Sequence, residues 1–143
     1  MGRVSRLFMS GVVLTVAMFA IAITVNAQTR GAAAPAAKTL KNPVASTPAS
    51  ITAGAAAYKK YCAFCHGTAG KGDGPLAPKD AEPADLTDAK WDHGAADGDI
   101  FNVIQNGGGA TSKMVAFKGK MPDQDMWHIV NFIRSLGPKD APR

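Results

Sequence analysis

The chain has 143 residues, 46% of them hydrophobic and 19% charged, which leaves room for one small folded domain and little more. Its formal net charge of +5 would suit a nucleic-acid-binding surface, but five of the 16 basic residues precede residue 51, and the 11 that follow are matched by 11 acids. The part that can fold is therefore formally neutral, which argues against a phosphate-binding surface and predicts no nucleic-acid partner.

Residues 1–27 have the pattern of a targeting segment. Arg3 and Arg6 give a positive start, residues 7–25 form an apolar run, and Val25-Asn26-Ala27 places small residues at a cleavage position. The run is long for a signal peptide and near the lower limit for a membrane span, so a cleaved signal peptide and an uncleaved membrane anchor both stay open. In either case the folded domain is expected outside the cytoplasm.

Residues 28–50 are rich in Ala, Pro, Thr and Ser and contain no acid. A segment of this composition cannot bury a core, so we expect a disordered linker. If residues 7–25 remain in the membrane, the linker acts as a tether. The folded domain is predicted to span residues 51–138, followed by a short tail at 139–143.

The first helix of this domain is predicted to begin at Thr52, whose hydroxyl can cap it, and to run through an Ala-rich stretch to Tyr61. Gly54 lowers helix propensity there, and two interpretations are equally open. It permits a close crossing with another helix, or it is a glycine of the first turn without a packing role.

The helix leads into Cys62-Ala63-Phe64-Cys65-His66, which holds the only two cysteines of the chain. C-x-x-C-H is the pattern at which a c-type haem is attached. In a helix its cysteines and histidine fall at i, i+3 and i+4, which share one face, so two thiols can form thioethers to one porphyrin while the imidazole binds its iron.

Two other interpretations of the cysteine pair are weaker. A thioredoxin-type disulfide would sit at the start of a helix that follows a strand, whereas a helical pattern precedes this pair. A structural zinc site needs four ligands, and the remaining candidates, His93 and His128, stand at no familiar spacing from the cysteines.

Beyond the motif, glycines and prolines from Gly67 to Pro83 predict a long loop that can approach a cofactor closely. A helix is predicted over 97–106, with acids at its start, and Gly107 ends it. Another loop then carries Met114. The last helix follows Pro122 and ends before Gly137-Pro138. Its apolar residues recur at helical spacing: Met126, Ile129, Val130, Ile133 and Leu136.

Residues 52–137 resemble a class I (monohaem) bacterial cytochrome c. The resemblance rests on Gly54-x-x-x-Tyr58, Cys62-x-x-Cys65-His66-Gly67, Gly72-Asp73-Gly74-Pro75 and the helix around Trp127. It implies a small all-α fold, with three to four helices around one covalently bound haem c and long Gly/Pro-rich loops. It also implies that the N- and C-terminal helices cross at a glycine and an aromatic residue.

The same resemblance implies the roles of the site residues. Cys62 and Cys65 would hold the haem covalently and His66 would be the proximal iron ligand. The carbonyl of Pro75 would accept a hydrogen bond from His66 and fix its ring.

The sixth ligand is less clear, because the family usually presents M-P-x-F before the last helix. Here Met114-Val115-Ala116-Phe117 fills that position, with Val115 in place of proline. Met114 is the favoured distal ligand. Met121, followed by Pro122, is the alternative, although it abuts the helix start, where the family has a packing residue. His93 and His128 are predicted to be surface residues.

A haem closed by His and Met suits outer-sphere electron transfer rather than catalysis, so the sequence predicts a periplasmic electron carrier and not an enzyme. Its partners would be redox proteins such as a membrane complex, a dehydrogenase or a terminal reductase or oxidase. They would dock at a rim around Ala69, Lys71, Lys113 and Lys118. Two alternatives are a haem subunit of a larger oxidoreductase, and a haem enzyme or gas sensor with an open distal position.

Overall fold

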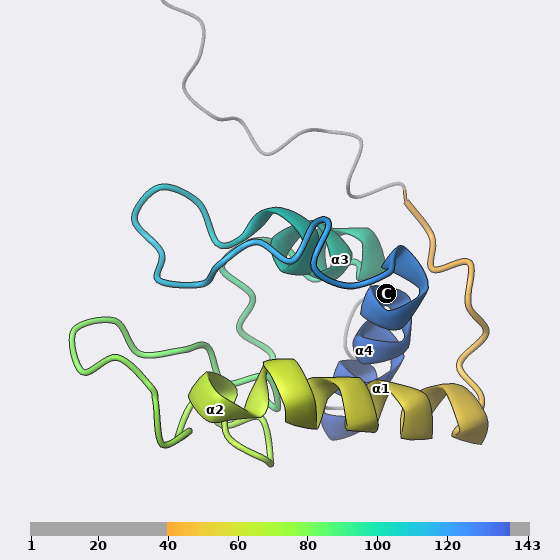
Figure 1. Cartoon of the computed structure of the whole chain (residues 1–143), viewed down its shortest axis with the longest axis horizontal. Coiled ribbons are helices and arrows are strands. Elements are labelled where there is room, and N and C mark those ends of the chain that lie inside the picture. The colour runs from red at the N-terminus through yellow and green to blue at the C-terminus, as the bar shows by residue number, and fades with distance from the viewer. Residues whose placement is uncertain (1–39, 138–143) are drawn as a thin grey trace, which may run out of the picture. The chain divides into compact units, whose positions relative to one another are not determined.

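The structure is a computed structural model that describes residues 40–137. This part is helical, with no strand and a single isolated bridge between Lys118 and Met121 (Figure 1). The predicted all-α class is confirmed. The four helices are α1 (Pro48–Tyr61), α2 (Ala63–His66), α3 (Asp97–Asn106) and α4 (Asp123–Leu136).

The leader predicted for residues 1–27, most of the linker and the tail at 139–143 lie outside the described residues. None of the helices within residues 40–137 combines the length and the apolar character that crossing a membrane requires.

Helix α1 begins one turn earlier than predicted. Its N-cap is Thr47, whose side-chain oxygen accepts a hydrogen bond from the backbone N–H of Ser50 at 3.2 Å. Pro48 occupies the first helical position, where a missing N–H costs nothing. The predicted cap, Thr52, lies inside the helix and donates to the carbonyl of Pro48 at 2.9 Å instead. The prediction of Thr52 as the cap is therefore wrong, because Pro48 is favoured at the first helical position and places the cap at Thr47.

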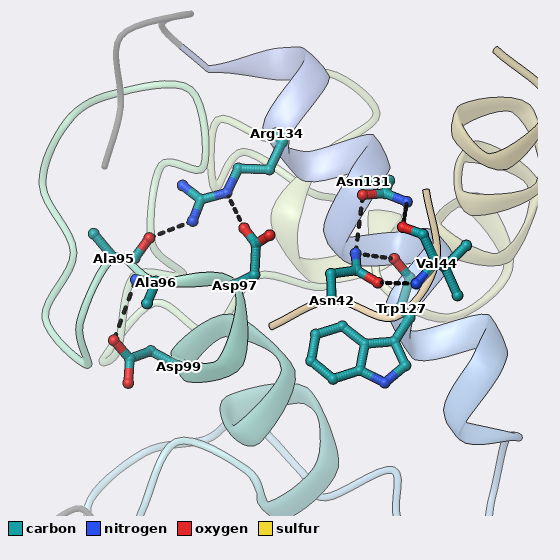
Figure 2. A network of polar contacts seen from close by, with 9 residues as sticks. All are labelled: Asn42, Val44, Ala95, Ala96, Asp97, Asp99, Trp127, Asn131 and Arg134. Atoms are coloured by element: carbon teal, nitrogen blue, oxygen red, sulfur yellow. Dashed lines mark hydrogen bonds and ion pairs between the residues drawn. The ribbon is translucent and has the colours of Figure 1, made fainter. Parts of the chain in front are cut away.

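The segment before α1 is ordered by contacts with α4, so the linker prediction is wrong for residues 40–50. The Asn42 side-chain amide donates to the carbonyl of Trp127 at 3.2 Å and to Asn131 Oδ1 at 2.9 Å (Figure 2). Asn131 in turn donates to the carbonyl of Val44 at 3.1 Å, and Val44 packs against the core. The ordered part thus starts near Asn42, because Asn42 and Asn131 donate hydrogen bonds to the carbonyls of Trp127 and Val44. These long-range hydrogen bonds cannot be predicted from local propensity.

Helices α1 and α4 cross in close contact at Gly54, which decides between the two interpretations of that residue. A Cβ atom there would lie 2.0 Å from the carbonyl oxygen of His128 and 2.9 Å from the Cβ of Phe132. Beside the crossing, the rings of Tyr58 and Phe132 stand 5.0 Å apart between centroids. The largest fully buried side chains among the described residues all belong to these two helices: Tyr58, Met126, Ile129 and Val130.

Helix α3 has the predicted bounds, and Gly107 ends it with a φ of 81°, a left-handed conformation that favours glycine. Phe101 stacks on Trp127 of α4, with ring centroids 4.0 Å apart and planes at 8°. Arg134 of α4 fixes the start of α3, because its Nε donates to Asp97 Oδ1 at 2.8 Å and a second nitrogen donates to the carbonyl of Ala95 (Figure 2).

His93 is exposed, as predicted, but His128 is not a free surface residue. Its Nδ1 lies 2.8 Å from the hydroxyl of Ser50, which is buried and also accepts a hydrogen bond from Asn131. His128 stands three residues before Asn131 and four before Phe132, and this helical spacing turns its ring toward α1.

Replacing Gly54 with alanine tests the crossing. The added methyl group would meet the backbone of His128, which cannot rotate away, so Gly54→Ala should lower the free energy of unfolding by about 3 kcal/mol. Denaturant unfolding of the holoprotein measures this change. Ala53→Ser, at an exposed position of the same helix, is the matched control and should change stability by less than about 0.5 kcal/mol. Equal stability of Gly54→Ala and the wild type would contradict the observed crossing.

Candidate functional site

The cysteine and histidine residues of the motif lie on one helical turn, as their spacing predicts. Helix α1 ends at Tyr61, and Cys62 keeps right-handed helical dihedral angles before α2 begins. The carbonyl of Cys62 accepts hydrogen bonds from the N–H of Cys65 at 3.1 Å and of His66 at 2.9 Å. Two thiols and an imidazole are therefore held together by backbone geometry at the end of the helix that crosses α4.

The two thiols are free and have different environments. Cys62 is buried, and this burial, with a smaller contribution from Cys65, raises the pKa of its thiol to about 12. Cys65 is half-buried, with its Sγ 3.6 Å from the carbonyl of Leu76. Cys62 is therefore a protonated thiol at neutral pH, unlike the thiolate that thioredoxin-type exchange requires.

The described part of the chain contains no site at which protein side chains alone could bind a metal ion. Within residues 40–137, no group of three or more His, Cys, Asp or Glu side chains is placed to bind an ion. The zinc interpretation of the cysteine pair therefore gains no ligands from the fold.

The ring of His66 is fixed by a carbonyl, but not by the predicted one. Its Nδ1 lies 3.2 Å from the carbonyl oxygen of Ala84, and no hydrogen bond to Pro75 is present. The chain near Ala84 is brought back to the motif by Leu86, whose N–H donates to the carbonyl of Gly70 at 2.6 Å. The role of Ala84 could not be predicted from the sequence, because every residue has a backbone carbonyl. Which carbonyl reaches His66 depends on how the loop folds back.

Burial lowers the pKa of His66, and the hydrogen bond with Ala84 opposes this shift only in part. The imidazole is therefore neutral at pH 7. Because Nδ1 is engaged by Ala84, Nε2 is the nitrogen left to bind a metal, which is the arrangement usual for histidine ligands.

The glycines after the motif let the following loop lie directly against it. A Cβ at Gly74 would come within 2.4 Å of the carbonyl oxygen of Phe64, and Gly67 adopts a φ of 75° beside Asp73. The buried hydroxyl of Tyr58 donates to the carbonyl of Gly67 at 2.9 Å and ties this loop to α1. The loop is thus anchored at the turn that carries the cysteines.

The second loop, residues 107–121, folds back along the end of α3. The N–H of Phe117 donates to the carbonyl of Ile104 at 3.1 Å, and that of Lys118 donates to the carbonyl of Gln105 at 3.0 Å. Met121, at the end of this loop, is only 6% exposed and belongs to the core. Met114 is half-buried and packs at the edge of that core.

The residues at this site suit a large apolar cofactor attached through the thiols. In the described part of the chain the exposed large hydrophobic residues include Phe64 of the motif, Leu76 of the first loop and Val115 of the second, with Leu76 66% and Val115 57% exposed. Apolar surface of this kind is costly in water and is favourable beneath a porphyrin. Two thiols and a neutral imidazole on one turn are the groups that could supply the covalent attachment and an iron ligand.

A small helical domain with this site defines a c-type cytochrome. The chain belongs to the family described as cytochrome c oxidase, cbb3-type, subunit III, whose model matches residues 49–133. It is of the class I, monohaem type and carries one covalently bound haem c.

Two solved structures are similar in sequence as well as in fold. One is a chain of the reducing HAO-like protein complex Kustc0457/Kustc0458 of Kuenenia stuttgartiensis, with 28% identity and a TM-score of 0.59 over 67% of this chain and 47% of that one. The other is cytochrome cL of the marine methylotroph Methylophaga aminisulfidivorans, with 27% identity and a TM-score of 0.50 over 62% and 53%. This chain thus spans about half the length of each.

A further c-type cytochrome, KustC0563, shares the fold at 24% identity and a TM-score of 0.50, over 59% of this chain and 98% of its own. No match was found among curated proteins.

Replacing the two cysteines tests their role in attachment. Cys62→Ser and Cys65→Ser each remove one thiol, so each variant should retain less covalent haem than the wild type, and the double variant should retain none. Haem staining of denatured protein, produced in a host that matures c-type cytochromes, measures retention. Thr68→Ala, at an exposed position just after the motif, is the control and should retain haem fully. Full retention by the double variant would contradict the assignment.

Proposed function

We propose that the protein is a periplasmic electron carrier whose haem iron is bound by His66 on one side and Met114 on the other. The proposal rests above all on one observation, the placement of Cys62, Cys65 and a neutral His66 on a single turn at the end of α1. When bound there, the haem supplies an iron that changes oxidation state by one electron. The protein contributes the attachment, the two ligands and an apolar surrounding.

Each residue has a defined part in this function. The carbonyl of Ala84 holds the ring of His66, so that Nε2 keeps its direction in both oxidation states. The two cysteines fix the cofactor to the same turn. Leu76 and Val115 provide apolar side chains that exclude water from it. Small rearrangement between oxidation states favours rapid outer-sphere transfer.

Burial favours Met114 over Met121 as the distal ligand. Met121 is 6% exposed, its N–H donates to the carbonyl of Phe117 at 3.3 Å, and its side chain packs in the core beside the start of α4. Met121 is thus committed to core packing, whereas Met114 is half-buried in the loop and contacts the core only at its edge. A thioether ligand also raises the reduction potential relative to a second histidine.

The proposed location rests on the predicted leader, and the proposed partners rest on the small interfaces typical of redox proteins. A leader over residues 1–27 would export the chain, either as a cleaved signal peptide or as an anchor through residues 7–25. The partners would be redox proteins that dock briefly near the haem, as small redox interfaces do.

A second candidate function is that of a haem subunit in a larger oxidoreductase. The similarity to a chain of the reducing HAO-like protein complex Kustc0457/Kustc0458 favours it. A stable complex with a catalytic chain, purified at the same stoichiometry in successive columns, would identify a subunit. Purification as a free protein would identify a carrier.

Paired methionine variants test the proposed ligand set. Met114→Ala should lower the midpoint potential and change the ligand-field spectrum, because the thioether is lost, while the fold stays stable. Met121→Ala should leave both unchanged but lower the free energy of unfolding by about 2–4 kcal/mol, because it empties a buried site. Redox titration and denaturant unfolding of the two holoproteins give these values. The reverse pattern would make Met121 the ligand.

A further inference from the structure

Four side chains form a continuous surface feature next to the haem motif. The Nζ of Lys60 lies 4.7 Å from the ring centroid of Tyr61, the rings of Tyr61 and Phe117 meet edge to face at 6.0 Å, and the Nζ of Lys120 lies 5.9 Å from the ring of Phe117. Both rings are half-buried and both lysines are exposed. We call these four residues the lysine–aromatic cluster.

The cluster connects the two segments that carry the proposed iron site. Tyr61 is the last residue of α1 and directly precedes Cys62. Phe117 lies three residues after Met114, and its backbone is fixed by the hydrogen bond to Ile104. A molecule bound at the cluster would therefore touch residues adjacent to both the attachment turn and the Met114 loop.

Charge is unevenly distributed over the domain, although its sum is zero. Residues 107–121 contain three lysines and no acid, whereas residues 73–99 contain eight acids and two lysines. Among the described residues neither Lys60 nor Lys120 forms an ion pair. The Tyr61 side chain is the main cause that raises the pKa of Lys60, and the charge of Asp125 adds a smaller increase, so the ammonium group is charged at neutral pH. The cluster is thus a local positive site with an apolar centre.

We propose that the lysine–aromatic cluster is the docking surface for an acidic face of the redox partner, a refinement that rests on the proposed electron-carrier function. Carboxylates of the partner would pair with Lys60 and Lys120, while apolar groups would pack on Tyr61 and Phe117. Aromatic centres with charged rims are common at interfaces, and complementary charge raises the encounter rate. The docking rim predicted from the sequence, around Ala69, Lys71, Lys113 and Lys118, shares no residue with this cluster. The two surfaces have in common only the second loop, which carries Lys113 and Lys118 of the rim and Phe117 and Lys120 of the cluster.

A second copy of the chain is a poorer occupant than a separate acidic protein. Six of the eight acids in residues 73–99 are already engaged by neighbouring backbone, hydroxyl or basic groups: Asp80, Asp85, Asp88, Asp92, Asp97 and Asp99. Within residues 40–137, only Asp73 and Glu82 of this set show no such bond.

Small oxidants of opposite charge test the proposal without a known partner. Ferrous holoprotein gives one electron to ferricyanide, an anion, or to tris(phenanthroline)cobalt(III), a cation, and becomes ferric while the oxidant is reduced. Stopped-flow rates are measured against ionic strength for the wild type, for Lys60→Gln/Lys120→Gln and for Lys90→Gln. Lys90 is the matched control, because it is exposed and lies in the acidic segment with a weak contact to Asp92.

The wild-type rate with ferricyanide should fall as salt rises, and the double variant should react about threefold or more slowly at low salt, while Lys90→Gln should behave as the wild type. Poly-L-glutamate should slow the wild type but not the double variant.

Equal rates for all three proteins would overturn the docking surface and leave the carrier function intact. A holoprotein that exchanges electrons with neither oxidant would instead contradict the carrier function. Salt-dependent dimers of the wild type, lost in the double variant, would reassign the surface to a second copy.

Discussion

The close contact of α1 with α4 at Gly54 determines where the proposed haem-binding residues lie. Because this contact leaves no room for a side chain, the two helices approach until backbone meets backbone, and Tyr58 and Phe132 close the space beside them. Helix α1 then delivers Cys62 at a fixed position and in a helical conformation. The attachment turn is therefore an extension of the best-packed element of the domain rather than a free loop.

Local sequence signals were sufficient where periodicity and a terminator coincide. Helix α3 has the predicted bounds because acids stand at its start and Gly107 at its end. The same reasoning failed at α1, where Thr52 was the predicted cap. The helix instead has Thr47 as its N-cap and Pro48 at its first position. The crossing at Gly54 was one of two open interpretations, since glycine lowers helix propensity whether or not a second helix packs on it.

Features that depend on distant segments could not be predicted from the sequence. The order of residues 40–47 requires Asn42 to meet Asn131, 89 residues later, and composition alone suggested a linker. His128 was expected at the surface, but its partner Ser50 belongs to another helix. The carbonyl that holds His66 belongs to Ala84, which only loop closure brings near the motif. The motif residues themselves were predictable because a single turn positions all three.

Net charge also proved a poor guide to the surface. The sequence count gives a neutral domain, and neutrality argues against a phosphate-binding surface. The fold nevertheless places Lys60 and Lys120 beside two aromatic rings that meet edge to face, while most acids of residues 73–99 are engaged in contacts of their own. Local arrangement, and not the total, therefore sets the electrostatic character of the site next to the motif.

The central claim is that His66 and a methionine sulfur close both axial positions of the haem iron. The optical spectrum of the ferric holoprotein tests it most directly, together with carbon monoxide binding to the ferrous form. We expect the weak red charge-transfer band of iron bound to methionine sulfur, and no spectral change when carbon monoxide is added. Absence of this band, with ready carbon monoxide binding, would contradict the account and indicate an open distal position suited to catalysis or sensing.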